Sequence, residues 1–149
     1  FMGGWVGDAT NVIDYITIGS TGNAIDFGDL TTGKGSYFGA TGSNVRGLSM
    51  GGQRSSTYSY DKVDVIDYVT IASTGNASDF GDLSAANYAN SATSNNTRGL
   101  SVGGSSPSAN VDILEYVTIA STGNATDFGD LSAARSALAA VSASHGGLQ

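Results

Sequence analysis

The sequence contains no cysteine, a single proline and a single histidine, and each shortage narrows the kind of protein that it can be. Without cysteine it has neither a disulfide framework nor a thiol nucleophile, and the lone His145 cannot anchor a zinc site. No apolar run reaches the roughly 18 residues of a membrane helix, and no basic-then-apolar leader is present, so we expect no membrane span and no signal peptide. Nothing near His145 resembles a nucleophile turn, and we expect no enzyme, no metal and no cofactor.

Charged residues are also few, and most of them are acidic. Six Lys and Arg stand against 13 Asp and Glu, and the net charge of -7 argues against a nucleic-acid partner. The 22 glycines separate many short apolar runs, a pattern that is typical of all-β structure. The segment Ala133–Ser144 has the composition of a helix, but its counterparts elsewhere in the chain do not, so we expect an Ala-rich strand there.

One stretch of 20 residues occurs three times, as Val12–Thr31, Val65–Ser84 and Ile113–Ser132. Repetition at this period is the signature of a repeat architecture. In each copy the second residue lies 14 positions before a phenylalanine, so the unit accepts no insertions. The chain divides into three repeats, about 1–48, 49–100 and 101–149, which we interpret as one repeat domain.

Each repeat predicts short antiparallel strands. The β-branched run Val65–Ile71, like Val12–Ile18 and Ile113–Ile119, is too short for a helix and favours a strand. Ser73–Asn76 supplies residues that tolerate φ > 0, so we expect the chain to reverse there. A segment of small residues follows each hairpin and predicts a further strand, at Ser36–Gly42, Tyr88–Thr93 and Ala137–Ser142. Four short strands per repeat are typical of the blades of a β-propeller.

The order of glycine and aromatic residues resembles the kelch motif, in which an apolar strand ends in Gly-Gly, a Tyr follows in the third strand and an aromatic residue in the fourth. Phe stands in place of the usual Trp, and Arg135 fits the Arg that often trails the motif. Three sets of residues carry the likeness: Gly3-Gly4, Tyr15 and Phe27; Gly51-Gly52, Tyr68 and Phe80; Gly103-Gly104, Tyr116 and Phe128. The chain is similar, over its whole length, to kelch-like arrays in structural proteins of tailed bacteriophages.

This resemblance implies a kelch-like β-propeller of which the chain supplies three four-stranded antiparallel blades. It implies a non-catalytic virion protein, tail- or fibre-associated, that contacts other virion proteins or a host surface glycan. The alternative is a secreted bacterial carbohydrate-binding propeller. Because propellers close with about four to eight blades, we expect further blades or association between copies. The diglycine strand, split between Phe1–Gly4 and Gly147–Gln149, is the expected junction.

Three patterns are candidates for chemistry. The turn Asn-x-x-Asp-Phe-Gly-Asp, as in Asn76–Asp82, offers fewer than the roughly six oxygens of a calcium site, so we interpret it as hydrogen bonding in turns and at strand ends. We interpret the carboxylates Asp14, Asp67 and Glu115, inside apolar strands, as structural acceptors of backbone N–H groups. The diglycines predict close backbone packing rather than phosphate binding.

The connections after each diglycine vary in length and composition, and variable loops on a fixed scaffold are where binding usually resides. They are Trp5–Asn11, Gln53–Lys62 and Ser105–Asn110, and the kelch resemblance implies that they share one face. The candidate recognition residues are Trp5, Arg54, Tyr58 and Tyr60, a mixture of rigid rings and a hydrogen-bonding cation that is typical of protein-made contact surfaces.

Overall fold

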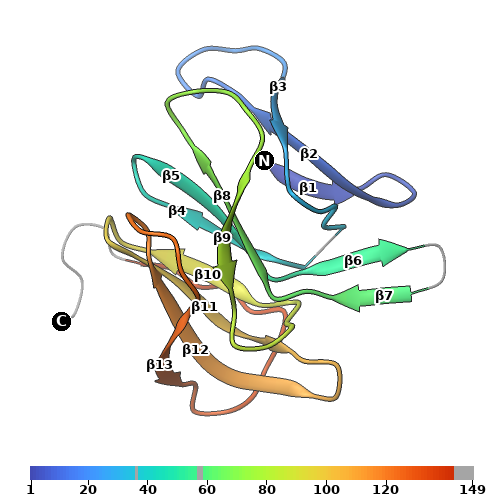
Figure 1. Ribbon diagram of the computed structural model, residues 1–149, viewed down its shortest axis with the longest axis vertical. Helices are drawn as coiled ribbons and strands as arrows, with labels where there is room; N and C mark the ends of the chain where they lie inside the picture. The colour runs from blue at the N-terminus through green and yellow to red at the C-terminus, as the bar shows by residue number, and fades with distance from the viewer. Residues whose placement is uncertain (36, 57–58, 143–149) are drawn as a thin grey trace.

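The computed structural model describes residues 1–35, 37–56 and 59–142, and within these it contains thirteen strands and no helix. The strands form three antiparallel sheets that follow the three repeats, arranged from top to bottom in Figure 1, and one separate hairpin. The predicted all-β class is confirmed. A closed propeller is not seen across the described residues.

Two of the sheets are four-stranded and antiparallel, and each takes its first strands from the end of one repeat and its last two strands from the next repeat. In the second sheet, the order is β4 (Gly39–Gly42), β5 (Arg46–Met50), β8 (Val65–Thr70) and β9 (Ser78–Asp82). In the third sheet, it is β10 (Ser91–Ser94), β11 (Arg98–Ser105), β12 (Asn110–Thr118) and β13 (Thr126–Asp130). Four-stranded antiparallel sheets, as predicted, are therefore present twice, but their boundaries are offset from those of the sequence repeats.

The first repeat departs from this pattern. Its sheet has three strands, in the order β1 (Met2–Trp5), β2 (Ala9–Tyr15) and β3 (Ile25–Asp29). The predicted strand at Val12–Ile18 ends early, at Tyr15. The variable connection of the second repeat forms the separate hairpin, β6 (Gln53–Ser56) and β7 (Ser59–Lys62).

The strand predicted at Ala137–Ser142 was wrong, since this segment forms no strand. It runs beside the third sheet, where Ala137 N–H donates to the Ala89 carbonyl at 2.8 Å and Ala140 N–H donates to Ser91 Oγ at 2.9 Å. Its counterparts β4 and β10 are strands because β5 and β11 complete their ladders. No such partner lies beside it among the described residues, and residues 143–149, including His145 and Gly147–Gln149, lie outside them.

The core lies between neighbouring sheets. Between the second and third sheets it consists of Leu48, Met50, Ile66, Phe80, Leu83, Val117 and Ile119. Between the first and second it consists of Ile13, Leu30 and Val69. Each such side chain contributes about 1.5–3 kcal/mol through burial, so the fold depends on sheets packing face to face.

The diglycines are points of close backbone approach, as predicted. A Cβ at Gly51 would lie 2.6 Å from the Asn87 carbonyl oxygen, and one at Gly103 would lie 2.8 Å from that of Arg135. Both glycines have φ near +60°, at +66° and +54°. The strand therefore bends where it passes the chain that follows each hairpin, which only glycine permits.

Equivalent loops follow β2, β8 and β12, and the loops after β8 and β12 link neighbouring repeats. We call residues 18–24, 71–77 and 119–125 the first, second and third bridging loops. In the second, Gly75 N–H donates to the Phe27 carbonyl and Ala77 N–H to that of Asp29, both at 2.7 Å. Asn76 Oδ1 accepts from Asp29 N–H at 3.1 Å. The loop therefore extends the first sheet past β3 with backbone hydrogen bonds from the next repeat.

The third bridging loop repeats this pattern on β9. Gly123 N–H donates to the Phe80 carbonyl at 2.7 Å and Ala125 N–H to that of Asp82 at 2.8 Å, while Asn124 Oδ1 accepts from Asp82 N–H at 3.1 Å. The predicted chain reversal is therefore confirmed. The asparagine bonds at a strand end, as predicted, but the strand belongs to the preceding repeat.

Candidate functional site

The three variable connections extend on one side of the molecule. In Figure 1 the β1–β2 turn, the β6–β7 hairpin and the β11–β12 turn all project to the right, away from the bridging loops. One contact joins the β6–β7 hairpin to Gly35 in the segment after β3, and another joins the hairpin to the β11–β12 turn. Gly35 N–H donates to the Gln53 carbonyl at the start of β6 at 2.9 Å, and Lys62 Nζ at the end of β7 donates to the Ser106 carbonyl at 2.6 Å.

Trp5 lies at the end of β1 and is 51% exposed. Its ring covers Gly35, since a Cβ built there would lie 2.7 Å from a ring carbon and 3.1 Å from the Ala9 side chain. The neighbouring residue Gly35 also bonds to β6. Trp5 and the β6–β7 hairpin therefore start from adjacent points on the surface.

The other predicted recognition residues belong to the hairpin. Arg54 is exposed in β6 and lies directly opposite Asp61 in β7. Tyr60 pairs with Ser55 in the same ladder. Tyr58 lies outside the described residues. The structure thus brings Trp5, Arg54 and Tyr60 to one side of the molecule.

An aromatic cluster on this side escaped the sequence reasoning. Lys62 Nζ lies 4.3 Å from the centroid of the Tyr88 ring, and Tyr88 meets Tyr37 edge to face at a centroid distance of 6.3 Å. Tyr37 is 62% exposed and has φ of 61°. Both tyrosines stand in segments that consist mostly of small residues, which is the signal that would have found them.

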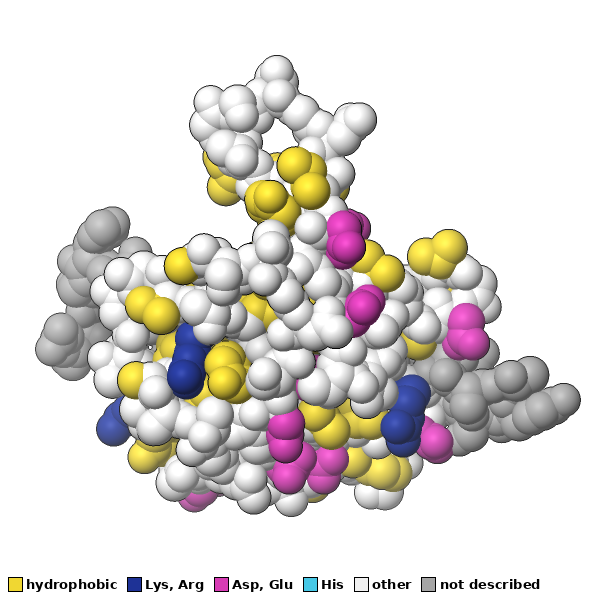
Figure 2. Space-filling model, turned by 45° about the horizontal axis from the view of Figure 1, so that its top comes forward, with side chains coloured by type: hydrophobic (Ala, Val, Ile, Leu, Met, Phe, Trp, Pro, Cys, Tyr) yellow, Lys and Arg dark blue, Asp and Glu magenta, His cyan; other side chains and the backbone are white. Residues whose placement is uncertain are grey.

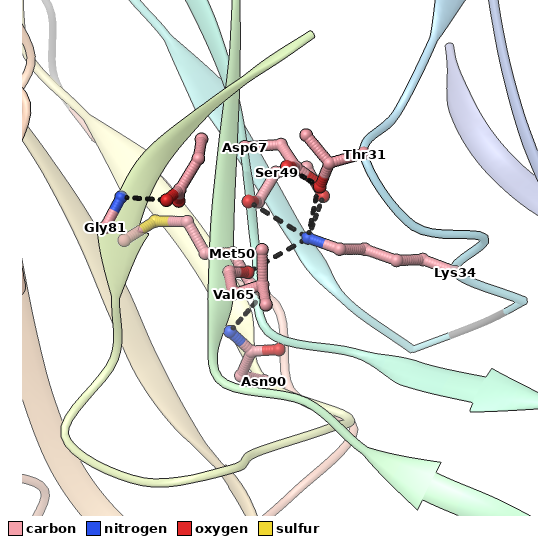
Figure 3. Close-up of polar contacts among 9 residues, drawn as sticks. Thr31, Lys34, Ser49, Met50, Val65, Asp67, Gly81 and Asn90 are labelled. Atoms are coloured by element: carbon pink, nitrogen blue, oxygen red, sulfur yellow. Dashed lines mark hydrogen bonds and ion pairs between the residues drawn. The ribbon is translucent and has the colours of Figure 1, made fainter.

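A buried ion pair lies at the junction of the first and second sheets (Figure 3). The Lys34 side chain reaches across from the first repeat, and its Nζ lies 3.1 Å from Asp67 Oδ2 and donates to Ser49 Oγ at 3.2 Å. It also donates to the Val65 carbonyl at 3.0 Å, and Thr31 Oγ1 donates to Asp67 Oδ1. Both charged side chains are completely buried.

Burial lowers the pKa of Lys34 from its usual value, and the nearby Asp67 carboxylate opposes that shift. Glu115 accepts from Ser84 N–H at 2.8 Å, which confirms the predicted backbone acceptor. Asp67 was predicted to accept backbone N–H groups as well, but its partners are the side chains of Lys34 and Thr31. These polar groups bond across the junctions between repeats, which is a structural role.

Two hollows near the junctions are small. One of about 140 Å³ is lined by Tyr68, Thr70 and residues 73–78. Another of about 220 Å³ lies between the β4–β5 turn and Ile119. Both fall below the roughly 300–1,000 Å³ of pockets for small molecules. Across the described residues no three metal-ligating side chains gather, and no helix is long and apolar enough to cross a membrane.

The geometry defines an all-β protein of repeated antiparallel sheets, joined by bridging loops on one side and carrying variable connections on the other. No protein-family model matches the chain, and no curated protein is significantly similar to it.

Proposed function

We propose that this chain is a non-catalytic structural and recognition module of a phage virion, a tail- or fibre-associated kelch-like propeller. The observation that carries the proposal is that the two kinds of loop lie on opposite sides and make different contacts. The bridging loops hold repeat to repeat through the same backbone bonds at both junctions. The variable connections gather on the opposite side, where exposed aromatic rings lie.

The propeller architecture is supported by how the sheets meet. Neighbouring sheets pack face to face over apolar cores, and each outermost strand, β3 or β9, is extended by the next repeat. Repetition of this one junction gives a series of equivalent blades, which is how propellers are built.

The proposed contact surface consists of Trp5, Tyr37, Arg54, Tyr60 and Lys62. The half-exposed ring of Trp5 and the exposed ring of Tyr37 present large rigid faces at a small loss of conformational entropy, and such faces stack well on sugar rings. A host surface glycan is therefore the proposed partner. The same surface fits the alternative, a secreted bacterial carbohydrate-binding propeller, and detection of the chain in purified virions separates the two.

The test is binding to host cells and to a glycan array by Trp5→Ala, Tyr37→Ala and Arg54→Ala variants. Val45→Ala is the matched control, because Val45 is an exposed apolar residue in the β4–β5 turn, on the side of the bridging loops. We expect the three variants to lose binding, and Val45→Ala to retain it, at equal urea midpoints. Unchanged binding by all three folded variants would exclude this surface.

A further inference from the structure

The junction that joins the repeats is left open at both ends of the described chain. At the two internal junctions a glycine of the last strand lies against the next bridging loop, and a Cβ at Gly81 would lie 2.5 Å from the backbone of Gly123. The equivalent Gly129 in β13 has nothing within 4 Å of such a Cβ. Gly22 N–H in the first bridging loop donates to no strand carbonyl among the described residues, unlike the equivalent N–H groups of Gly75 and Gly123. The strand and the loop that make this junction are thus both present without partners among the described residues.

Apolar side chains at the two open ends are also more exposed than their equivalents between the second and third sheets. Phe80 in β9 is 2% exposed, because the third repeat covers it, whereas the equivalent Phe128 in β13 is 52% exposed. Ile119 of the third bridging loop is 2% exposed and Ile71 of the second is 49% exposed, whereas the equivalent Ile18 is 93% exposed. Figure 2 shows hydrophobic side chains gathered at the base of a loop that projects from the body. Each end therefore exposes one half of an apolar contact that is buried at the junction between the second and third sheets.

The charged groups are complementary as well. The carbonyls of Lys34, Asn87 and Arg135 each accept from the second glycine of a diglycine, so the three residues occupy one position of the repeat. Lys34 of the first repeat pairs with Asp67 of the second. The counterparts at the open ends are Arg135, which is exposed, and Asp14, and neither side chain has a charged partner among the described residues.

Arg98 is a second basic residue that is placed to contact the next copy, as its equivalent Arg46 shows. Arg46 stacks 4.5 Å from the centroid of the Tyr68 ring and donates through Nη1 to the carbonyl of Ile119, in the bridging loop of the next sheet, at 2.8 Å. Arg98 stacks in the same way, 4.4 Å from the centroid of the Tyr116 ring. Its guanidinium is therefore held where it would meet the carbonyl equivalent to that of Ile119, which belongs to Ile18.

We propose that two copies of this chain associate head to tail, with the first bridging loop of one copy docked on β13 of the other. Gly22 N–H then donates to the Phe128 carbonyl, Asn23 Oδ1 accepts from Asp130 N–H, and Arg135 pairs with Asp14. The surface is fitted to a second copy because the chain already forms this junction twice within itself. Docking also removes an exposed strand edge, which proteins otherwise have to protect.

Two such junctions close a ring of six sheets. Head-to-tail contacts give rings when the rotation closes, and six lies within the range of about four to eight blades found in propellers. This proposal concerns a surface separate from the variable connections, so it stands or fails independently of what they bind.

The first experiment is a charge swap, with the molecular mass measured by analytical ultracentrifugation and native mass spectrometry. The wild type is expected at about twice the 14.9 kDa of one chain. Arg135→Asp places like charges at both junctions and is expected to weaken association at least about tenfold. The double variant Arg135→Asp/Asp14→Arg restores opposite charges and is expected to regain the dimer.

Two further variants test the backbone contacts. Asn23→Ala removes the acceptor for β13, and Gly129→Ala places a methyl group where Gly22 of the other copy docks, so both are expected to shift the protein toward monomer. Asn11→Ala removes an exposed amide from the middle of β2 and serves as the control. Far-UV circular dichroism confirms folding in each case.

A wild-type protein that stays monomeric at high concentration overturns the proposal. A dimer that survives both Arg135→Asp and Asn23→Ala overturns it too, because association then uses another surface. Failure of the charge-swapped double variant to regain the dimer counts against the pairing of Arg135 with Asp14. Larger head-to-tail species that disappear in the same variants support the junction, with an open chain in place of a ring.

Discussion

Replacing Lys34 with methionine is expected to lower the free energy of unfolding by about 3–5 kcal/mol, the usual loss when one partner of a buried ion pair is removed. Methionine retains an unbranched apolar chain, so packing changes little. The lost Nζ lies 3.0 Å from the Val65 carbonyl and 3.1 Å from Asp67 Oδ2, with both charged side chains fully buried. The Asp67 carboxylate would be left with the Thr31 hydroxyl as its donor.

A double variant that removes both charges measures the interaction between Lys34 and Asp67 apart from their other contacts. In Lys34→Met/Asp67→Asn neither member of the buried ion pair is charged, and the double variant is expected to be less destabilised than the sum of the single variants by about 0.5–3 kcal/mol. The free energies come from urea unfolding followed by far-UV circular dichroism at one protein concentration. Additive losses would refute the coupling inferred from the 3.1 Å contact.

Lys62→Met is the matched control for this series. It makes the same chemical change at a half-buried lysine that stacks on Tyr88 and bonds to a carbonyl of the β11–β12 turn. A cation–π contact at such a site is worth about 0.5–1 kcal/mol. If Lys62→Met lowered the free energy of unfolding as much as Lys34→Met does, burial of the lysine would not determine the loss of stability.

Three further outcomes follow from the junctions. Gly81→Ala and Gly129→Ala share strained φ values of +140° and +135°, but Gly81 also meets the third bridging loop, so in dilute urea unfolding its variant is expected to lose about 1–3 kcal/mol more. Asn76→Ala removes an acceptor across a junction and is expected to cost about 1 kcal/mol in the same assay. Desolvation lowers the pKa of Lys34 against the attraction of Asp67, so the unfolded chain binds more protons just below pH 10.5. Titrated unfolding should show the wild type gaining stability relative to Lys34→Met as the pH rises toward that value.

The strands and their sheets could be predicted because they depend on local sequence. The β-branched run of Val65–Thr70 and the glycines after Met50 specify a strand and a bend wherever they occur. Because the unit occurs three times, the same prediction applies to all three copies. The strand at Ala137–Ser142 failed because a strand also needs a ladder partner, and composition says nothing about what lies beside a segment.

Contacts between repeats could not be predicted in the same way. Asn76 looked like a residue that bonds in a turn or at a strand end, and only the packing of sheets places its Oδ1 on Asp29 of the preceding repeat. Lys34 lies between two glycines, where a lysine is ordinarily solvated. Its alignment with Arg135 was visible in the sequence, but the carboxylate that it meets was not.

The division between constant and variable connections has a physical cause. The second and third bridging loops each present two backbone N–H groups and an asparagine oxygen to the preceding repeat. Gly75 and Gly123 both have φ of +155°, so a change in length or in these residues breaks a junction. The variable connections meet each other through isolated bonds, such as that from Lys62 to Ser106. Their residues can change without disturbing the stacked sheets, so a surface for recognition can diversify there while the framework stays fixed.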